Sequence, residues 1–214
     1  NTGGRPDNPF LDHAFFLALE QSGCATARTG WQPQHILLEQ DGVPVGLLPL
    51  FLKSHSQGEY VFDWGWADAF ERAGGRYYPK LQGSVPFSPV SGRKLNAATL
   101  DLQHHLLDAS AELCSKIGAS SVHTTFVTEE EEALAAEAGW LTRHDTQFHW
   151  RNKGYDRFDD FLDSLASRKR KTIRRERRDA LTDGLRAEWI TGSDLTEAHW
   201  DAFYAFYMDT GGRK

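Results

Sequence analysis

The chain has 214 residues, of which 40% are hydrophobic and 12% aromatic, and its formal net charge is −6. These values are typical of a globular protein with one large domain or two small ones, and they exclude an intrinsically disordered chain. No run approaches the roughly 18 to 20 apolar residues of a membrane-spanning helix, and the overall acidity disfavours a general nucleic-acid coat protein.

The cysteine and histidine residues bear on compartment and metal content. Cys24 and Cys114 are the two cysteines, which excludes a disulfide scaffold and is typical of a reducing cytoplasm. The N-terminus, NTGGRPDNPF, lacks the basic and then apolar layout of a secretory signal peptide. The nine histidines show no metal-ligand spacing. We therefore expect a cytoplasmic protein with no metal and no membrane span.

The first part of the chain predicts one helix followed by strands. Asp7 or Asn8 is placed to cap the helix, and Pro9 suits its first position. The dipeptide Asp41-Gly42 is a strong hairpin signal between two apolar runs. The predicted elements are a helix over residues 7–23 and strands over residues 35–40, 43–53 and 60–64.

Apolar residues show neither helical nor strand periodicity between residues 64 and 94, where Gly, Pro and aromatic residues are mixed. A stretch this long that matches neither helix nor strand is typical of a functional loop or lid. Regular patterns then return, with predicted helices over residues 95–118 and 128–139 and strands over residues 120–127 and 140–152. Residues 1–150 therefore predict a mixed α/β or α+β domain, with helices packed on a sheet.

A second unit is predicted over residues 151–214. Its elements are helices over residues 158–166 and 194–210, a basic helical segment between them, and a strand over residues 185–192. One strand is too little to close a sheet, so we expect this unit to be incomplete in the chain.

The segment SRKRKTIRRERR, residues 167–178, concentrates positive charge in an acidic protein. Eight Lys or Arg residues and one acid, Glu176, lie between Arg168 and Arg178, so the window sums to +7 and the rest of the chain to −13. On a helix these cations mostly face away from an apolar stripe about 120° wide. A helix that starts at Ser164 or Ser167 has a cationic first turn, which the helix dipole disfavours by about 0.3–1 kcal/mol per charge.

Three interpretations of this basic segment stay open. It is a solvated helix face paired with acids from elsewhere in the chain, a site for a phosphate-bearing ligand, or a nucleic-acid interface. An anion held at the helix N-terminus would reverse the sign of the dipole effect. The candidate phosphate-binding residues are Lys169, Arg170, Arg174 and Arg175.

The stretch between residues 53 and 94 mixes polar and aromatic side chains. Such a mixture is typical of a ligand pocket, and a Trp-rich loop also serves as structural cover over one end of a sheet, so both interpretations stay open. The chain contains no nucleophile elbow, phosphate loop or dinucleotide-binding motif. The candidate substrate-binding residues are Lys53, His55, Tyr60, Asp63, Trp64, Trp66, Tyr77, Tyr78, Lys80 and Arg93.

Four segments together resemble one protein family: NPFLDHAFFLALE, TGWQPQHILLE, LPLFLKSHSQGEYVFDWGWADAFERAGGRYYPKLQGSVPFSPVSGRKL and QFHWRNKGYDRFDDFLDSLASRKRKTIRRERR. The chain resembles the bacterial FemAB-like proteins, described as peptidoglycan biosynthesis/recognition proteins of the GNAT superfamily of N-acyltransferases. The resemblance covers nearly the whole chain. It implies two GNAT-like halves in tandem, each a twisted mixed sheet flanked by helices. The first half would be residues 1–150, and residues 151–214 would open a truncated second half.

The resemblance also implies a chemistry, the transfer of an acyl or aminoacyl group to an amine. The donor would be acetyl-CoA or another acyl-CoA, or an aminoacyl-tRNA, and the acceptor a small-molecule or nucleotide-linked peptide of the cell wall. The acyl-CoA loop of GNAT enzymes, R/Q-x-x-G-x-G/A, is not found, since the nearest match, ERAGGRYY, fails at Tyr77. No catalytic residue is therefore assigned. A non-catalytic binding module and an RNA-binding protein are the alternatives.

Overall fold

The computed structural model describes residues 8–182 and 184–212 of a mixed α+β protein. The chain divides into two compact units, unit 1 (Asn1–Asp145) and unit 2 (Thr146–Lys214). The mixed α+β class predicted from the sequence is confirmed. The assignment of the units to two GNAT-like halves stays a prediction.

A short helix opens unit 1. Asp12 has an extended backbone, and its side chain accepts a hydrogen bond from the N–H two residues on, so α1 (His13–Gln21) begins directly after it. A single turn of 3-10 helix, η1 (Pro9–Leu11), precedes α1. The helix predicted over residues 7–23 is thus confirmed with a later start, and the expected cap Asp7 lies outside the described residues.

Four short strands form the first sheet, in the order β1-β4-β5-β7. They are β1 (Trp31–Pro33), β4 (Phe51–Lys53), β5 (Lys80–Gly83) and β7 (Val122–Thr124). The β1/β4 and β4/β5 pairs are antiparallel, and the β5/β7 pair is parallel. Parallel neighbours need a crossover connection, and α3 (Leu100–Ile117) supplies it.

The second sheet is antiparallel and contains β2 (Ile36–Gln40), β3 (Val43–Leu48) and β6 (Asn96–Ala97). The predicted hairpin is confirmed, because both turn residues, Asp41 and Gly42, have the positive φ angles (52° and 75°) that a two-residue hairpin favours. The single strand predicted over residues 43–53 is wrong. It divides into β3 and β4, which belong to different sheets.

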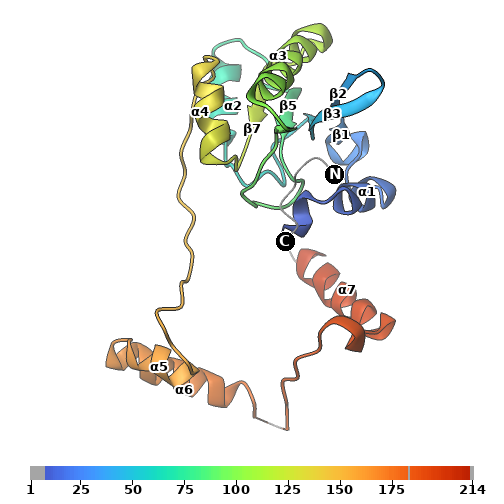
Figure 1. Ribbon diagram of the computed structural model, residues 1–214. Helices are drawn as coiled ribbons and strands as arrows, with labels where there is room; N and C mark the ends of the chain where they lie inside the picture. The colour runs from blue at the N-terminus through green and yellow to red at the C-terminus, as the bar shows by residue number, and fades with distance from the viewer. Residues whose placement is uncertain (1–7, 183, 213–214) are drawn as a thin grey trace. The chain divides into compact units, whose positions relative to one another are not determined.

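Helix α3 packs against the sheets and closes the main core of unit 1. It contacts β2, β3, β6 and β7, and Figure 1 shows it lying across the strands. Buried leucines from strands and helices meet beneath it, and each contributes about 1.5–3 kcal/mol by leaving water. The buried leucines of this core are Leu48, Leu50, Leu81, Leu95, Leu106, Leu107 and Leu134.

Helix α4 (Glu129–Glu137) follows β7 and confirms the prediction for residues 128–139. The Thr128 side chain accepts a hydrogen bond from the Glu131 N–H, and the Glu131 carboxylate accepts one from the Thr128 N–H. This reciprocal capping box fixes the first turn of the helix.

The stretch between residues 64 and 94 has more regular structure than predicted, since it contains α2 (Trp64–Arg72) and β5. The strand predicted over residues 60–64 is wrong. Tyr60 and Phe62 have left-handed backbones (φ 59° and 50°), which a strand does not accommodate.

Two further strand predictions are also wrong. The described residues 140–152 and 185–192 form no strand, although their composition favours one. Residues 141–150 are all exposed and lie in an extended segment without a neighbouring strand.

Unit 2 consists of helices and connecting segments. Its helices are α5 (Phe158–Asp163), α6 (Ser167–Asp179), the 3-10 turn η3 (Gly192–Asp194) and α7 (Glu197–Gly212). The three α-helices were predicted and are confirmed, the basic segment among them. No helix within the described residues is long and apolar enough to cross a lipid bilayer.

Candidate functional site

Two buried lysines face each other in the first sheet. The antiparallel register of β4 and β5 places Lys53 directly opposite Lys80, and both residues are 0% exposed. Like charges at directly opposed positions of a sheet repel, and burial adds a desolvation cost of several kcal/mol per ion. These two ammonium groups therefore require buried anions beside them.

The segment that follows β4 supplies those anions. Lys80 Nζ donates to Glu59 Oε2 at 2.8 Å and to Asp63 Oδ2 at 2.6 Å. Lys53 Nζ lies 3.9 Å from Glu59 Oε1. Glu59 and Asp63 are each 2% exposed. Two cations and two carboxylates thus balance inside the protein, and we call these four residues the buried charge cluster.

Aromatic and hydroxyl groups surround the buried charge cluster. Tyr77 donates its hydroxyl hydrogen bond to Asp63 Oδ2 at 2.8 Å, and the hydroxyls of Ser56 and Tyr78 are 2.7 Å apart. On the other side, Lys53 Nζ lies 3.4 Å from the centroid of the Trp31 ring. This cation–π contact gives the second lysine an electrostatic partner where its carboxylate is distant.

Burial sets the proton affinities in the cluster. Burial lowers the pKa of Lys53 to about 7, although Glu59 acts in the opposite direction. Burial also raises the pKa of Glu59. For Asp63 the same effect is outweighed by hydrogen bonds, chiefly from Lys80, so its pKa falls to about 2. Lys53 can therefore gain or lose a proton near neutral pH, whereas Asp63 stays ionised.

Several buried polar atoms near the cluster lack a hydrogen-bond partner among the described residues. Two of them are the second carboxylate oxygens, Glu59 Oε1 and Asp63 Oδ1, and a third is Gln82 Oε1. Gln82 follows Lys80 by two positions on β5, so their side chains share one face of the sheet. Buried acceptors without protein partners are typical positions for an ordered water or a polar ligand group.

Five of the ten predicted substrate-binding residues meet in this region, namely Lys53, Asp63, Tyr77, Tyr78 and Lys80. The sequence analysis missed Glu59, which joins both lysines. Its spacing of four residues from Asp63 was the available signal.

The side chains of the other five predicted residues form no hydrogen bond or ion pair with the cluster among the described residues, although burial and then the nearby Lys53 charge lower the pKa of His55. Tyr60, Trp64 and Trp66 are 49%, 62% and 66% exposed, and Arg93 is also exposed. His55 packs against Gly30, and its Nδ1 accepts a hydrogen bond from the Gln57 N–H.

Two further buried charged residues of unit 1, Lys94 and Glu131, form hydrogen bonds that stabilise the fold. Lys94 Nζ donates to the carbonyls of Gly92 (2.8 Å) and Phe126 (3.1 Å). Glu131 Oε1 accepts hydrogen bonds from the N–H groups of Lys94 and Leu95. Each of these charged groups is satisfied by backbone, so they tie the 92–95 segment to α4.

The basic helix α6 has paired and unpaired cations. Arg170 lies 3.2 Å from Asp163, and Arg174 lies 3.4 Å from Asp159, both acids of α5. The remaining predicted phosphate-binding residues, Lys169 and Arg175, have no carboxylate within 4 Å in the part of the chain that the structure describes. Neighbouring acids thus account for only a part of this basic face.

The start of α6 adds to its positive character. Ala166 occupies the N-cap position and provides no side-chain hydrogen bond. The helix begins at Ser167, one of the two predicted starts, and Arg168, Lys169 and Arg170 follow in its first turn. Free N–H groups and cations at one helix end both favour an anion.

A sequence-family model described as FemAB-like, peptidoglycan biosynthesis/recognition, matches residues 2–214. The chain belongs to the FemAB-like family. The sequence resemblance is therefore confirmed over essentially the whole length of the chain. No curated protein and no solved structure matches the chain.

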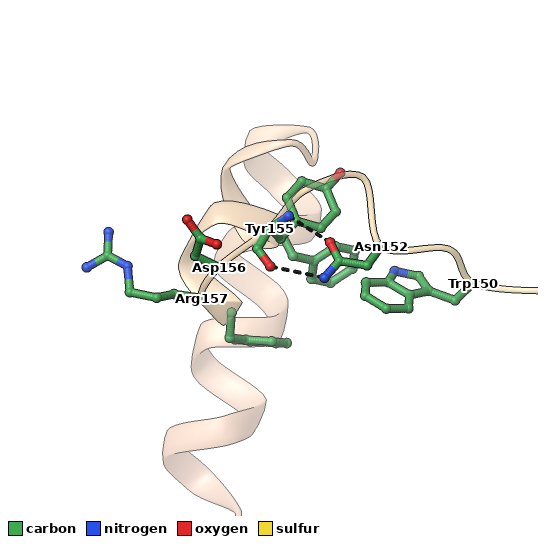
Figure 2. A pocket seen from close by; sticks show the side chains of 7 residues that line it. Trp150, Asn152, Tyr155, Asp156 and Arg157 are labelled. Carbon is green, nitrogen blue, oxygen red and sulfur yellow. Dashed lines mark hydrogen bonds between the residues drawn. The ribbon is translucent and has the colours of Figure 1, made fainter.

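The FemAB-like chain also has an open cavity of about 510 Å³ in unit 2, shown in Figure 2. Trp150, Tyr155, Phe158 and Phe161 provide its apolar lining. The cavity adjoins the basic helix, because the guanidinium of Arg177 lies 4.2 Å from the centroid of the Phe158 ring. The sequence analysis missed this cavity, since it assigned the residues around Trp150 to a strand.

Proposed function

We propose that this FemAB-like chain belongs to an N-acyltransferase that modifies an amine of a peptidoglycan precursor, and that α6 binds phosphate groups of its ligands. The donors that fit the proposal are a CoA thioester and an aminoacyl-tRNA. Both donors carry phosphates, as does a nucleotide-linked acceptor. One cationic surface therefore suits each of these ligands.

The observation that carries the proposal is the unpaired charge on α6. Arg168, Lys169, Lys171 and Arg175 are exposed and lack an ion pair among the described residues. Within unit 2, the acids of α5, Asp159 and Asp163, pair with Arg174 and Arg170. That these four cations, together with Arg177, have no carboxylate partner among the described residues of unit 2 supports an external anion as their partner.

The transfer itself requires little from the protein beyond positioning. The neutral amine nitrogen attacks the carbonyl carbon of the thioester or ester, the new C–N bond forms, and the C–S or C–O bond to the carrier breaks. The amine proton leaves to a base, and the carrier departs as a thiol or a hydroxyl after protonation. Holding the reactants about 3 Å apart supplies much of the rate enhancement, and no covalent enzyme intermediate is needed.

The buried charge cluster has a positioning role in this proposal. It anchors the segment after β4 and the start of α2, which carry the exposed side chains of Tyr60, Trp64 and Trp66. These aromatic groups are the proposed contacts for the acceptor. Lys53 and Lys80 are 0% exposed, so they hold this surface and do not touch the acceptor.

Substitution of the unpaired cations tests the proposal. In the full chain, Lys171→Ala combined with Arg175→Ala should weaken binding of acetyl-CoA or a UDP-linked muropeptide by about tenfold or more, because charge-assisted hydrogen bonds are lost. The melting temperature should hardly change, since both side chains are exposed. Binding is measured by calorimetric titration.

Arg186→Ala is the matched control, because Arg186 is also an exposed arginine of unit 2 but pairs with Glu188. Unchanged binding in the double variant would contradict a phosphate role for α6. An interaction with RNA alone, falling by about 0.7 log units per log unit of salt for each neutralised phosphate, would favour the RNA-binding alternative.

One observation favours a non-catalytic binding module as the second candidate. Three groups of the buried charge cluster with shifted pKa values, Lys53, Glu59 and Asp63, are closed to solvent. A catalytic base must reach the amine proton directly or through one water. Ligand binding without any acyl transfer in the full chain would support this second candidate.

A further inference from the structure

Aromatic side chains line the cavity in unit 2 in an arrangement that suits a flat ring as ligand. Trp150 and Tyr155 have ring centroids 6.4 Å apart with planes inclined by 31°, and Phe161 stands nearly edge-on to Trp150 at 6.0 Å. Trp150 is 66% exposed, so a large part of its ring surface is open to a ligand. The volume of about 510 Å³ lies within the range of small-molecule sites.

Few polar groups at the cavity remain available to a ligand. Asn152 is occupied, since its Oδ1 accepts from the Tyr155 N–H and its Nδ2 donates to the Tyr155 carbonyl (Figure 2). Its Oδ1 also accepts from the Gly154 N–H. The Asp156 carboxylate accepts no side-chain or backbone hydrogen bond from the described residues. A sugar ring carries several hydroxyls that need partners, whereas a nucleobase has two apolar faces and one polar edge.

A cation lies at the edge of the same cavity. Arg177 of α6 stacks on Phe158 at 4.2 Å, and among the described residues no carboxylate lies within 4 Å of its guanidinium. This arrangement leaves the guanidinium N–H groups free to bind an anion. An aromatic site for a ring thus adjoins a cationic helix.

We propose that this cavity binds the base of a nucleoside diphosphate, with the base stacked on Trp150 and the phosphates directed to Arg177 and the other cations of α6. The inference rests on the proposed function, because it identifies a nucleobase as a further part of the phosphate-bearing ligand that α6 is proposed to bind. It adds a base-binding site in unit 2 and assigns Asp156 as the acceptor for an N–H of the base edge or a ribose hydroxyl.

Calorimetric titration of the full chain with four probes tests this site. UDP and ADP carry a base and two phosphates, inorganic pyrophosphate carries no ring, and N-acetylglucosamine 1-phosphate carries a sugar but no base. We expect UDP or ADP to bind about tenfold or more tightly than pyrophosphate, because base–aromatic stacking contributes that much. Trp150→Ala should abolish the difference, and Trp150→Phe should restore most of it.

Trp189→Ala is the control, because Trp189 is a 97% exposed tryptophan of the same unit that does not line the cavity. The proposal is overturned if both nucleotides bind no better than pyrophosphate, or if their advantage survives Trp150→Ala. It is also overturned if the sugar phosphate binds as tightly as the nucleotides with the same dependence on Trp150.

The probes separate this inference from the proposed function. If pyrophosphate binding is unaffected by loss of Lys171 and Arg175 while the nucleotides keep their Trp150-dependent advantage, the phosphate role of those two cations fails and the base site stands. If pyrophosphate binding depends on them and the base adds nothing, the base site fails and the phosphate role stands.

Discussion

Lys53 shows how a single side chain can dominate the pH dependence of stability. Its ammonium group is 0% exposed, faces Lys80 across the sheet, and has its pKa lowered to about 7 by burial. In the unfolded chain its pKa returns to the ordinary value of 10.5. The folded and unfolded states therefore bind different numbers of protons between these two values.

The sign of the effect follows from this difference. Between about pH 7 and 10.5 the unfolded chain keeps the Lys53 proton that the folded protein has released. The free energy of unfolding should therefore rise with pH in this window, by up to about 1.4 kcal/mol per pH unit. Below pH 7 both states are protonated at Lys53, and this contribution to the slope vanishes.

The variant Lys53→Met should flatten the rise, as measured by urea unfolding at several values between pH 7 and 9. Lys94, whose pKa burial lowers to about 8, remains in both proteins, so the difference in slope isolates Lys53. Lys153→Met, at an exposed lysine, is the control and should leave the slope unchanged. Identical slopes in the wild type and Lys53→Met would contradict this account, because they would show that folding does not lower the pKa of Lys53.

At the residue scale, the sequence identified much of the cluster and missed how its members pair. Lys53, Asp63 and Lys80 stand out in an aromatic stretch as polar groups. Their pairing depends on the β4/β5 register, which involves residues 27 positions apart. Glu59 was missed because it lies in a turn between Gly58 and Tyr60, where a carboxylate is ordinarily solvated.

At the scale of elements, the carboxylate of Glu131 caps the start of α4 and also holds the segment at residues 94–95. Glu131 closes the capping box of its own helix and also accepts hydrogen bonds from the buried N–H groups of Lys94 and Leu95. The same side chain therefore stabilises a helix start and a distant loop.

Glu131→Ala should lower the free energy of unfolding by about 1–3 kcal/mol for each of the two N–H groups that loses its acceptor, as measured by urea unfolding. Glu129→Ala, an exposed acid in the same helical turn, should change it by no more than about 0.5 kcal/mol. Equal effects of the two substitutions would contradict the conclusion that Glu131 joins α4 to the segment containing Lys94 and Leu95.

Elements that are specified locally were predicted well. The helices α3, α4 and α6 carry their own periodicity, so the sequence alone locates them. The start predicted for α3 is wrong, because the helix begins after the cap Thr99 and Asn96–Ala97 form β6. The strands predicted over 140–152 and 185–192 were wrong because strand formation depends on a pairing partner, which is not a local property. Helix α2 was missed because Trp and Gly have low helix propensities.

At the scale of the whole molecule, charge is distributed unevenly between the segments. Residues 168–178 sum to +7 and the rest of the chain to −13, and five of the eight cations of α6 have no ion pair within the described residues of unit 2. These unpaired cations are the basis on which we propose a phosphate-bearing ligand for this surface. The acyl donor and the acceptor amine follow from neither the sequence nor the fold, because the family is defined by similarity across the chain and not by a catalytic motif.

The most direct test of the central claim is mass spectrometry of a UDP-linked muropeptide after incubation with the full chain and either acetyl-CoA or aminoacyl-tRNA. We expect one donor to add the mass of its acyl group at an amine of the muropeptide, and we expect Lys171→Ala with Arg175→Ala to slow the addition. A muropeptide that binds but gains no mass with either donor would contradict the transferase assignment.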